Sequence, residues 1–334
     1  MIPKFVSGSS PFHTMNIAII YHDADFDGKL SNEVCRYWLN RLHPNATIHS
    51  YGWDYGRPVR PPHDWSNVNH NIAPADWADY DAIYIVDLSV DELMARPGLR
   101  DKIVWIDHHK SAIEKWDATP SDAEPHPGAF QGLRIDGVAA CRLCWAYFTW
   151  PSPPKSVFVN REIQEPKLIR LAGEYDIWDH RDPNGKVLQF GLRALDEKGL
   201  CALIHEEFTS TGHSNLNNAI LAGKAIKSYS DKMADEYSSA YAQTLKWEGL
   251  TFCALNIGQR GNSDLLRGGI KPEHDACFAW RYTGKEVAVS LYHIEGKTHH
   301  DLSLIATKYG GGGHRGACGF RLTLDQLSKI LVAA

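Results

Sequence analysis

Four short apolar runs constrain the fold of this chain more than any other feature of its sequence. They cover residues 16–21, 46–51, 82–86 and 102–106, and they are rich in β-branched and aromatic residues. Three of them are nearly all apolar, which is typical of strands buried on both faces of a parallel sheet. A helical pattern follows the first run, with apolar residues on one face: Val34, Cys35, Trp38, Leu39 and Leu42. Strand and helix therefore alternate, which predicts an α/β fold with a parallel sheet.

The pattern changes twice in the second half of the chain. Residues 161–171 have helical spacing, and residues 215–247 predict one long helix that connects two domains. Strand-like runs return at 251–257, 276–281 and 286–292, before a glycine-rich segment at 310–320 and a short closing helix. We therefore expect a leader or disordered segment at 1–14, a first domain at 15–200, a helical linker at 201–248 and a smaller α/β domain at 249–334.

The composition excludes several classes of protein. The chain has 334 residues, with 35 Lys and Arg against 40 Asp and Glu, which gives a net charge of −5. This balance argues against a large basic surface for long nucleic acids. No apolar run approaches the roughly 18–20 residues that span a bilayer, so no membrane segment is expected. Residues 1–14 lack the apolar core of a signal peptide, and the expected compartment is the cytoplasm.

Acidic residues and histidines follow three of the four predicted strands. The segment 22–28 (HDADFDG) follows the first strand, Asp87 follows the third, and Asp107, His108 and His109 follow the fourth. In an open α/β sheet, ligands bind at the carboxyl ends of the strands. One such Asp is often only a helix cap, but three clusters at one edge would repel one another unless a cation neutralised them. Mixed carboxylate and imidazole ligands favour manganese, iron or zinc.

These motifs resemble those of the DHH-family phosphoesterases that carry a C-terminal DHH-associated domain. The resemblance extends from about Met15 to Phe320, and its most specific pieces are 106–111 (IDHHKS) and 301–320 (DLSLIATKYGGGGHRGACGF). Segment 173–178 (GEYDIW) resembles the fourth acidic motif as it appears in the oligoribonuclease, or nanoRNase, branch. The resemblance implies a parallel-sheet catalytic domain, a connecting helix and a smaller substrate-binding domain, with the active site in the cleft between the two domains.

The resemblance also implies a set of metal ligands and catalytic residues. Two divalent cations are expected, usually Mn²⁺, with Mg²⁺ or Co²⁺ as alternatives. The first would be held by His22, Asp25 and Asp87. The second would be held by Asp27, Asp87, His108 and Asp176, with Asp87 bridging the two. Asp107 would orient its neighbours, and His109 and His314 would contact the substrate phosphate.

The sequence departs from the family pattern at the first ligand. The commoner spacing places a histidine two residues before the first Asp of the DxDG core, where this chain has Asp23. His22 lies one residue earlier. Either His22 reaches the cation through a shift of one residue, which we favour, or Asp23 supplies an oxygen ligand instead.

The glycine-rich segment supplies the predicted substrate contacts of the second domain. They are Gly311, Gly312, Gly313, His314 and Arg315. Consecutive glycines remove every Cβ, so that backbone amides can approach a phosphate or a base edge closely. Many relatives also carry an arginine in the preceding strand, where this chain has SLYH at 290–293. Arg281 or Arg315 is a candidate to replace it.

Aromatic residues offer a second kind of substrate contact. The chain has 11 tryptophans, and Trp53, Trp65 and Trp178 lie near motif or loop segments. Bases of single-stranded nucleic acids stack on such side chains, although most tryptophans serve packing.

The predicted function is a manganese-dependent phosphodiesterase that hydrolyses short oligonucleotides or dinucleotides to nucleoside monophosphates. Two cations would neutralise the phosphodiester and lower the pKa of an attacking water. Alternatives are a cyclic-dinucleotide phosphodiesterase, a single-strand DNA exonuclease and a non-catalytic nucleotide-binding protein. No membrane partner is expected, and the sequence leaves a homodimer open.

Overall fold

The computed structural model of the chain describes residues 14–54, 76–118, 130–150, 152–210, 212–258 and 263–332. Residues 1–13 of the predicted leader, and Trp65, lie outside the described residues. The chain divides into two compact units, Met1–Lys224 (unit 1) and Ala225–Ala334 (unit 2). The division falls inside the long helix α9 (Ser214–Tyr241), so this helix contributes to both units.

Unit 1 is built on a four-stranded sheet in which every strand is parallel to its neighbours. The strands are β1 (Asn16–His22), β2 (Thr47–Trp53), β3 (Ala82–Val86) and β4 (Ile103–Ile106), in the spatial order β2-β1-β3-β4. The four predicted strands are therefore confirmed. After β1 the chain moves to one side of the sheet, and after β2 it returns to the other side of β1. Such a reversal between adjacent strands is where open α/β sheets bind ligands.

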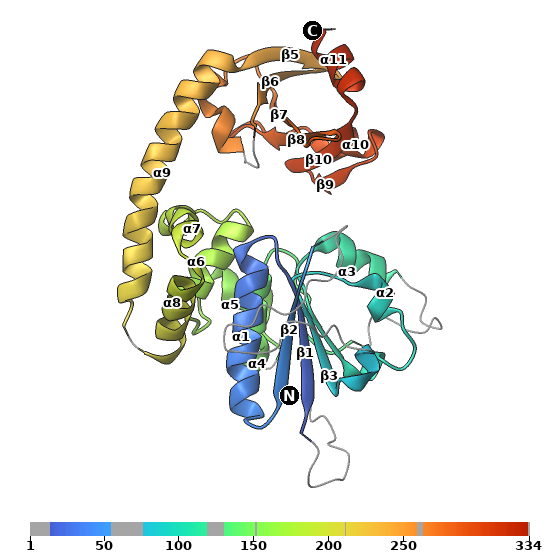
Figure 1. Ribbon diagram of the computed structural model, residues 1–334, viewed down its shortest axis with the longest axis vertical. Coiled ribbons are helices and arrows are strands. Elements are labelled where there is room, and N and C mark those ends of the chain that lie inside the picture. The colour runs from blue at the N-terminus through green and yellow to red at the C-terminus, as the bar shows by residue number, and fades with distance from the viewer. Residues whose placement is uncertain are drawn as a thin grey trace. The chain divides into compact units, whose positions relative to one another are not determined.

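Helices cover both faces of this sheet (Figure 1). The helices of unit 1 are α1 (Phe26–Leu42), α2 (Asp91–Met94), α3 (Lys110–Asp117), α4 (Ala140–Thr149), α5 (Lys155–Val159), α6 (Lys167–Asp176), α7 (Asn184–Ala194) and α8 (Glu197–Thr209). Alternate residues of one strand face opposite cores: Ile19 packs with residues of α1 and α4, whereas Ile20 packs with residues of α2 and α3. Burial on both faces explains why the strands are apolar throughout.

The helix predicted at residues 161–171 lies further along the chain than expected. The helix α6 begins at Lys167, after Pro166 as its N-cap, and continues to Asp176. Arg161 has a left-handed backbone, with φ of +57°, which no helix accommodates. The shift matters because it places Asp176, from the fourth acidic motif, at the carboxyl end of a helix.

Unit 2 contains a six-stranded mixed sheet in the order β5-β6-β7-β8-β10-β9. Its strands are β5 (Gln243–Trp247), β6 (Leu250–Asn256), β7 (Ala276–Tyr282), β8 (Val287–His293), β9 (Gly312–His314) and β10 (Ala317–Leu322). The helices α10 (Leu302–Lys308) and α11 (Leu324–Val332) pack on one face through Leu302 and Leu327. A smaller α/β domain was expected here, and it is confirmed.

The long helix predicted at residues 215–247 ends earlier than expected, at Tyr241. The residues after it form β5, in which Leu245 is buried while Thr244 and Lys246 on either side are exposed. This alternation is that of a strand, and β5 pairs with β6. The last part of the predicted linker at 201–248 therefore belongs to the sheet of unit 2.

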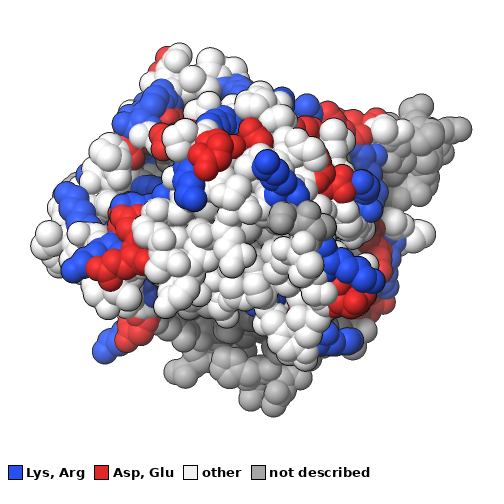
Figure 2. Space-filling model, turned by 90° about the horizontal axis from the view of Figure 1, so that it is seen from above, with Lys and Arg blue, Asp and Glu red and all other residues white. Residues whose placement is uncertain are grey.

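The surface carries charges of both signs. On the face drawn in Figure 2, Lys and Arg side chains are interspersed with Asp and Glu side chains around an area of uncharged residues. Many of the charges are paired, as in the contact of Arg267 with Asp231 and Asp235. Within the described ranges, no helix combines the length and the apolar character needed to cross a membrane.

Candidate metal centre

Three of the predicted ligands lie at the carboxyl ends of adjacent parallel strands. His22 is the last residue of β1, Asp87 follows β3, and His108 comes two residues after the end of β4. Asp87 has a left-handed backbone, with φ of +63°, a conformation that Asp tolerates better than most residues. Because β1, β3 and β4 are neighbours in the sheet, these side chains gather at one edge.

The helix α1 supplies two further carboxylates. Asp25 is its N-cap and accepts a hydrogen bond of 3.2 Å from the N–H of Gly28. Asp27 lies in the first turn and is 3% exposed. It accepts hydrogen bonds of 2.8 Å from the backbone N–H groups of Ala140 and Cys141. These groups form the amino end of α4, whose dipole favours a negative charge.

The first group of ligand atoms surrounds His22. Its Nδ1 lies 3.4 Å from Oδ2 of Asp25 and 3.4 Å from Oδ2 of Asp87. The three residues offer donor atoms that lie within 4.8 Å of one another, close enough to share one cation. This is the set predicted for the first cation.

The second group of ligand atoms surrounds His108. Its Nε2 lies 3.6 Å from Oδ2 of Asp27, 3.3 Å from Oδ1 of Asp87 and 3.5 Å from Oδ2 of Asp176. Asp176 reaches this group from the last position of α6. All four residues predicted for the second cation are thus brought together.

Asp87 is common to both groups, and its burial tests whether a cation fits. Its side chain is 2% exposed, and within the described part of the chain neither carboxylate oxygen accepts a hydrogen bond. A buried carboxylate without hydrogen bonds is costly unless a positive charge compensates it. Oxygen and imidazole donors are the ligands that manganese, iron and zinc accept. The residues present therefore fit divalent cations.

Electrostatics within the cluster point the same way. Burial and the negative charge of Asp27 hold the pKa of Asp87 well above its usual range. Burial, Asp27 and Asp87 do the same to the pKa of Asp176. Burial alone would lower the pKa of His22, but its interactions with the nearby carboxylates of Asp25 and Asp87 outweigh burial and raise that pKa to about 11. Keeping all of these buried carboxylates ionised is therefore unfavourable unless a positive charge lies among their oxygens.

Asp107 lies beside the ligands rather than among them. Its Oδ1 accepts hydrogen bonds from the backbone N–H of His108 at 2.7 Å and of His109 at 3.2 Å. The same oxygen lies 2.7 Å from Nδ1 of His109. Burial lowers the pKa of His109, but the hydrogen bond and charge of Asp107 outweigh it and raise that pKa. The hydrogen bond through Nδ1 therefore fixes the orientation of the His109 imidazole.

The structure separates the two candidates for the first ligand. In the described residues a third group, formed by Asp87, His108 and His109, is also close enough to share an ion. Asp23 belongs to none of the three groups, whereas His22 belongs to the first. The carboxylate of Asp23 packs against Gly52 of β2, and its backbone N–H donates to the carbonyl of Trp53. His22, and not Asp23, is brought to Asp25 and Asp87.

Two other neighbours of the cluster were missed by the sequence motifs. Asp54 follows β2, and its Oδ1 lies 3.9 Å from Nε2 of His22. The argument that ligands bind at the carboxyl ends of the strands applies to Asp54 as it does to the residues that follow the other three strands. Glu174 is 1% exposed and binds Arg161 through hydrogen bonds of 2.6 and 2.8 Å and Arg170 through one of 2.9 Å. These contacts fix the last turn of α6, which carries Asp176.

In unit 2 some glycines of the glycine-rich segment are required by packing, and others are exposed. A Cβ on Gly311 would lie 2.0 Å from the carbonyl oxygen of Gly319 in β10. Gly313 has φ of +132°, a conformation that side chains rarely adopt. Both glycines are therefore required by the close approach of β9 to β10. Gly312 is exposed with open space around it. His314 ends β9 and is exposed.

Arg315 interacts within its own unit. Its Nη2 donates to the carbonyl of His299 at 2.8 Å. The segment that lacks the family arginine lies on β8, where Tyr292 pairs with Ala317 of β10. The predicted substrate-binding roles of residues 311–315 remain predictions.

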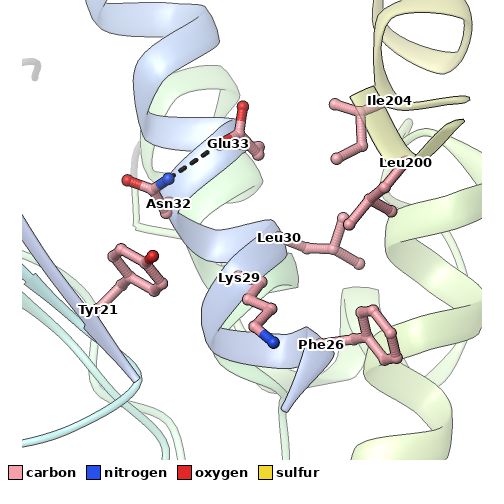
Figure 3. A pocket seen from close by; sticks show the side chains of 8 residues that line it. All are labelled: Tyr21, Phe26, Lys29, Leu30, Asn32, Glu33, Leu200 and Ile204. Carbon is pink, nitrogen blue, oxygen red and sulfur yellow. Dashed lines mark hydrogen bonds between the residues drawn. The ribbon is translucent and has the colours of Figure 1, made fainter. Parts of the chain in front are cut away.

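A small pocket elsewhere in unit 1 is not part of this centre (Figure 3). Its lining residues come from the end of β1, from α1 and from α8: Tyr21, Phe26, Lys29, Leu30, Asn32, Glu33, Leu200 and Ile204. The side-chain amide of Asn32 donates to Glu33 at 2.9 Å. None of these eight residues is a predicted ligand.

Comparisons with known proteins bear on the fold. No family model matches the chain, and no curated protein matches it. Among solved structures, the chain is similar to the DHH domain of a protein described as a member of a family of ribosomal proteins. The identity is 14% over 96% of this chain and 85% of that chain, with a TM-score of 0.56.

Two further solved structures are similar along nearly the whole chain. An exopolyphosphatase-related protein from Bacteroides fragilis has 14% identity over 96% of this chain and 91% of that chain, with a TM-score of 0.50. A pGpG-specific phosphodiesterase, PggH, from Vibrio cholerae has 13% identity over 96% of this chain and 97% of that chain, with a TM-score of 0.49. The likeness to the DHH domain confirms the predicted resemblance at the level of the fold: this chain has the fold of DHH-domain proteins.

Proposed function

We propose that this chain is a metal-dependent phosphodiesterase that hydrolyses short oligonucleotides or dinucleotides to nucleoside monophosphates. One observation carries the proposal. The carboxylate of Asp87 faces His22 through Oδ2 at 3.4 Å and His108 through Oδ1 at 3.3 Å. A buried carboxylate approached by ligand groups on both sides is suited to bridge two cations, and two-metal sites are a recurrent device for hydrolysing phosphate esters.

The residues that would hold the cations follow from the two groups of donor atoms. The first cation would be held by His22, Asp25 and Asp87, and the second by Asp27, Asp87, His108 and Asp176. We propose manganese, because carboxylates and imidazoles suit it, with Mg²⁺ or Co²⁺ as alternatives. When bound, such cations neutralise the phosphodiester and lower the pKa of water toward about 7.

His109 is the proposed general acid. Asp107 accepts a hydrogen bond from its Nδ1 at 2.7 Å, which fixes the ring. Nε2 would carry the proton that the leaving oxygen needs, and positioned acids of this kind contribute about 10²- to 10⁴-fold. Asp107 would keep the ring oriented while this proton moves.

Charge supports a short substrate. The net charge is −5, and on the face drawn in Figure 2 the described basic side chains alternate with acidic ones. A protein that follows long strands gains affinity from many phosphate contacts along a basic track. The GEYDIW segment, which resembles the oligoribonuclease branch, supports the same choice. We propose His314 of unit 2, with residues 311–313 and Arg315, as further contacts to this substrate.

The test is a product assay with purified protein, with and without added manganese and with a chelator. The substrates are a dinucleotide, a short RNA oligomer, a short single-stranded DNA oligomer and a cyclic dinucleotide. We expect nucleoside monophosphates from the dinucleotide and the short RNA only when manganese is present. Faster turnover of the cyclic dinucleotide or of DNA would contradict the proposed substrate but would support the proposed phosphodiesterase activity.

The matched control is the double variant His108→Ala and His109→Ala, with its fold checked by circular dichroism. Its turnover should fall by more than the roughly 10- to 100-fold that the loss of a supporting contact typically costs. If wild type and variant release product at similar rates, the two-metal assignment is wrong. If wild type binds manganese and nucleotides but releases no product from any substrate, the chain is a binding protein on a phosphoesterase scaffold.

A further inference from the structure

An exposed tryptophan follows α6 at a backbone position where glycine is the usual residue. The N–H of Trp178 donates to the carbonyl of Tyr175 at 3.1 Å, and the N–H of Asp179 donates to the carbonyl of Glu174 at 2.8 Å. This pair of hydrogen bonds defines the Schellman motif at the end of a helix, whose left-handed residue is most often glycine. Trp178 occupies that position with φ of +60°.

Packing does not explain this choice of residue. A left-handed backbone is unfavourable for any residue with a Cβ, and glycine would avoid the cost. The side chain of Trp178 is 68% exposed, so it gains little from burial. The ring contact that the structure describes is an edge contact with His180, at 5.5 Å between centroids. The indole is therefore maintained at a cost to folding, which suggests a use outside folding.

The loop around Trp178 is anchored on both sides. Before it, Glu174 binds two arginines of unit 1, as described above. After it, the guanidinium of Arg181 donates to both carboxylate oxygens of Asp179 and, at 2.9 Å, to the carbonyl of Val159. An exposed aromatic ring on a fixed backbone loses little freedom when it binds a ligand, and this favours recognition.

Trp178 is also close to the proposed site of chemistry. It lies two residues after Asp176, and consecutive Cα atoms are about 3.8 Å apart. Oδ2 of Asp176 lies 3.5 Å from Nε2 of His108. A nucleotide whose phosphate is at the metal centre would have its base within reach of residues that surround it.

We propose that Trp178 is a stacking platform for a nucleobase next to the phosphate at the metal centre. The inference rests on the proposed function only for the position of that phosphate. Stacking recognises the π-face that every base offers, so Trp178 would distinguish nucleotides from sugar phosphates without selecting a particular base.

The experiment measures binding rather than turnover. AMP and ribose 5-phosphate are titrated calorimetrically, in the presence of manganese, into the wild type and the variants Trp178→Ala and Trp178→Phe. We expect the wild type to bind AMP more tightly than ribose 5-phosphate. Trp178→Ala should lose about 5- to 150-fold in affinity for AMP and keep its affinity for ribose 5-phosphate. Trp178→Phe should keep most of the preference for AMP.

Trp150→Ala is the matched control. Trp150 is 39% exposed and caps the carboxyl end of α4, whose opposite end binds Asp27. The affinity of this variant for AMP should equal that of the wild type. A further variant, Trp178→Gly, should unfold at a higher temperature than Trp178→Ala, because glycine suits the left-handed position.

The outcomes separate this inference from the proposed function. Equal affinity for AMP in wild type and Trp178→Ala, or equal losses for AMP and ribose 5-phosphate, overturns the stacking role. This holds whether or not the chain cleaves dinucleotides in a parallel assay. A selective loss for AMP without any cleavage supports stacking and refutes the phosphodiesterase.

Discussion

Oδ1 of Asp107 accepts a hydrogen bond from Nδ1 of His109, at 2.7 Å, and thereby fixes the plane of the imidazole. The carboxyl group of Asp107 is fully buried, and its Oδ2 accepts no hydrogen bond from the described residues. One oxygen therefore organises both histidines of the pair through three hydrogen bonds.

The substitution Asp107→Asn tests this relationship. The amide oxygen can still accept hydrogen bonds, but the charge that raises the pKa of His109 is lost. We expect kcat for a dinucleotide to fall by about 10- to 100-fold, the effect that outer contacts of metal sites typically have. Manganese content, measured by atomic absorption, should remain that of the wild type. An unchanged kcat would contradict the role of His109 in catalysis. A loss of bound manganese would show that Asp107 supports the metal ligands instead.

The substitution Asp87→Asn should separate stability from metal binding. Asn keeps the shape and tolerates the left-handed backbone, but it removes a buried negative charge that accepts no hydrogen bond from the described residues. Without metal, we expect the variant to be more stable than the wild type, on the order of 1 kcal/mol. Manganese should raise the unfolding temperature of the wild type far more than that of the variant. Equal shifts on adding manganese would show that Asp87 bridges nothing.

The variants His22→Ala and Asp23→Ala settle the first ligand. His22 lies at 3.4 Å from two carboxylates, and Asp23 packs on β2 instead. We expect His22→Ala to bind one manganese ion fewer per chain than Asp23→Ala, which should match the wild type. Metal analysis after gel filtration gives the count. Equal content in the two variants contradicts the assignment.

His314→Ala tests the contribution of unit 2. If His314 contacts the substrate phosphate, KM for a dinucleotide should rise by about 10-fold or more, with manganese content unchanged. Lys329→Ala is a suitable control, because Lys329 is exposed on α11, pairs with Asp325 of the same helix and is not a predicted substrate contact, so that KM should change little. Kinetics of His314→Ala equal to those of the wild type would leave unit 2 without a role in binding.

His274 predicts a pH dependence of stability in unit 2. Its ring is buried, with Nδ1 accepting from the N–H of Lys271 at 3.0 Å and Nε2 donating to Thr244 at 2.9 Å. Burial lowers its pKa, with smaller effects from neighbouring charges. Folded His274 therefore stays neutral while the unfolded chain takes up a proton below about pH 6.5. Its contribution is full above that pH and is lost as the pH falls toward the lowered pKa.

The measurement compares wild type with His274→Gln by thermal unfolding at several pH values. The wild type should be the more stable of the two near neutrality. This advantage should shrink as the pH is lowered through about 6. A difference that is constant or grows on acidification would contradict the lowered pKa.

The sheet of unit 1 was predictable because its strands are buried on both faces. Residues 82–86 were predicted as a strand, and β3 has those bounds. The helix at 161–171 was displaced because periodicity alone ignored Pro166, which caps α6 rather than lying within it. The end of α9 was misplaced because apolar spacing continued into β5, where it has the period of a strand.

The gathering of segment 22–28, Asp87 and residues 107–109 was predictable because parallel strands bring their carboxyl ends to one edge. Asp176, which lies on α6, and the division of the residues between two cations came only from the resemblance to the DHH family. Two features of the site had no signal in the motifs. Asp54 follows a strand whose end carries no recognised motif. The hydrogen bonds from Ala140 and Cys141 to Asp27 join residues 113 and 114 positions apart through backbone donors. Every residue except proline has a backbone N–H, so hydrogen bonds from backbone donors cannot be recognised from the amino-acid sequence.

The double attachment of Asp27 determines how mutagenesis of this centre must be interpreted. Its oxygens anchor the start of α4 and also face His108, so a variant that lacks them loses a helix attachment together with a ligand. If such a variant were inactive, the loss of a metal ligand could not be distinguished from a loss of structure. Asp176, whose side chain is 26% exposed at the end of α6, offers the cleaner position for dissecting catalysis.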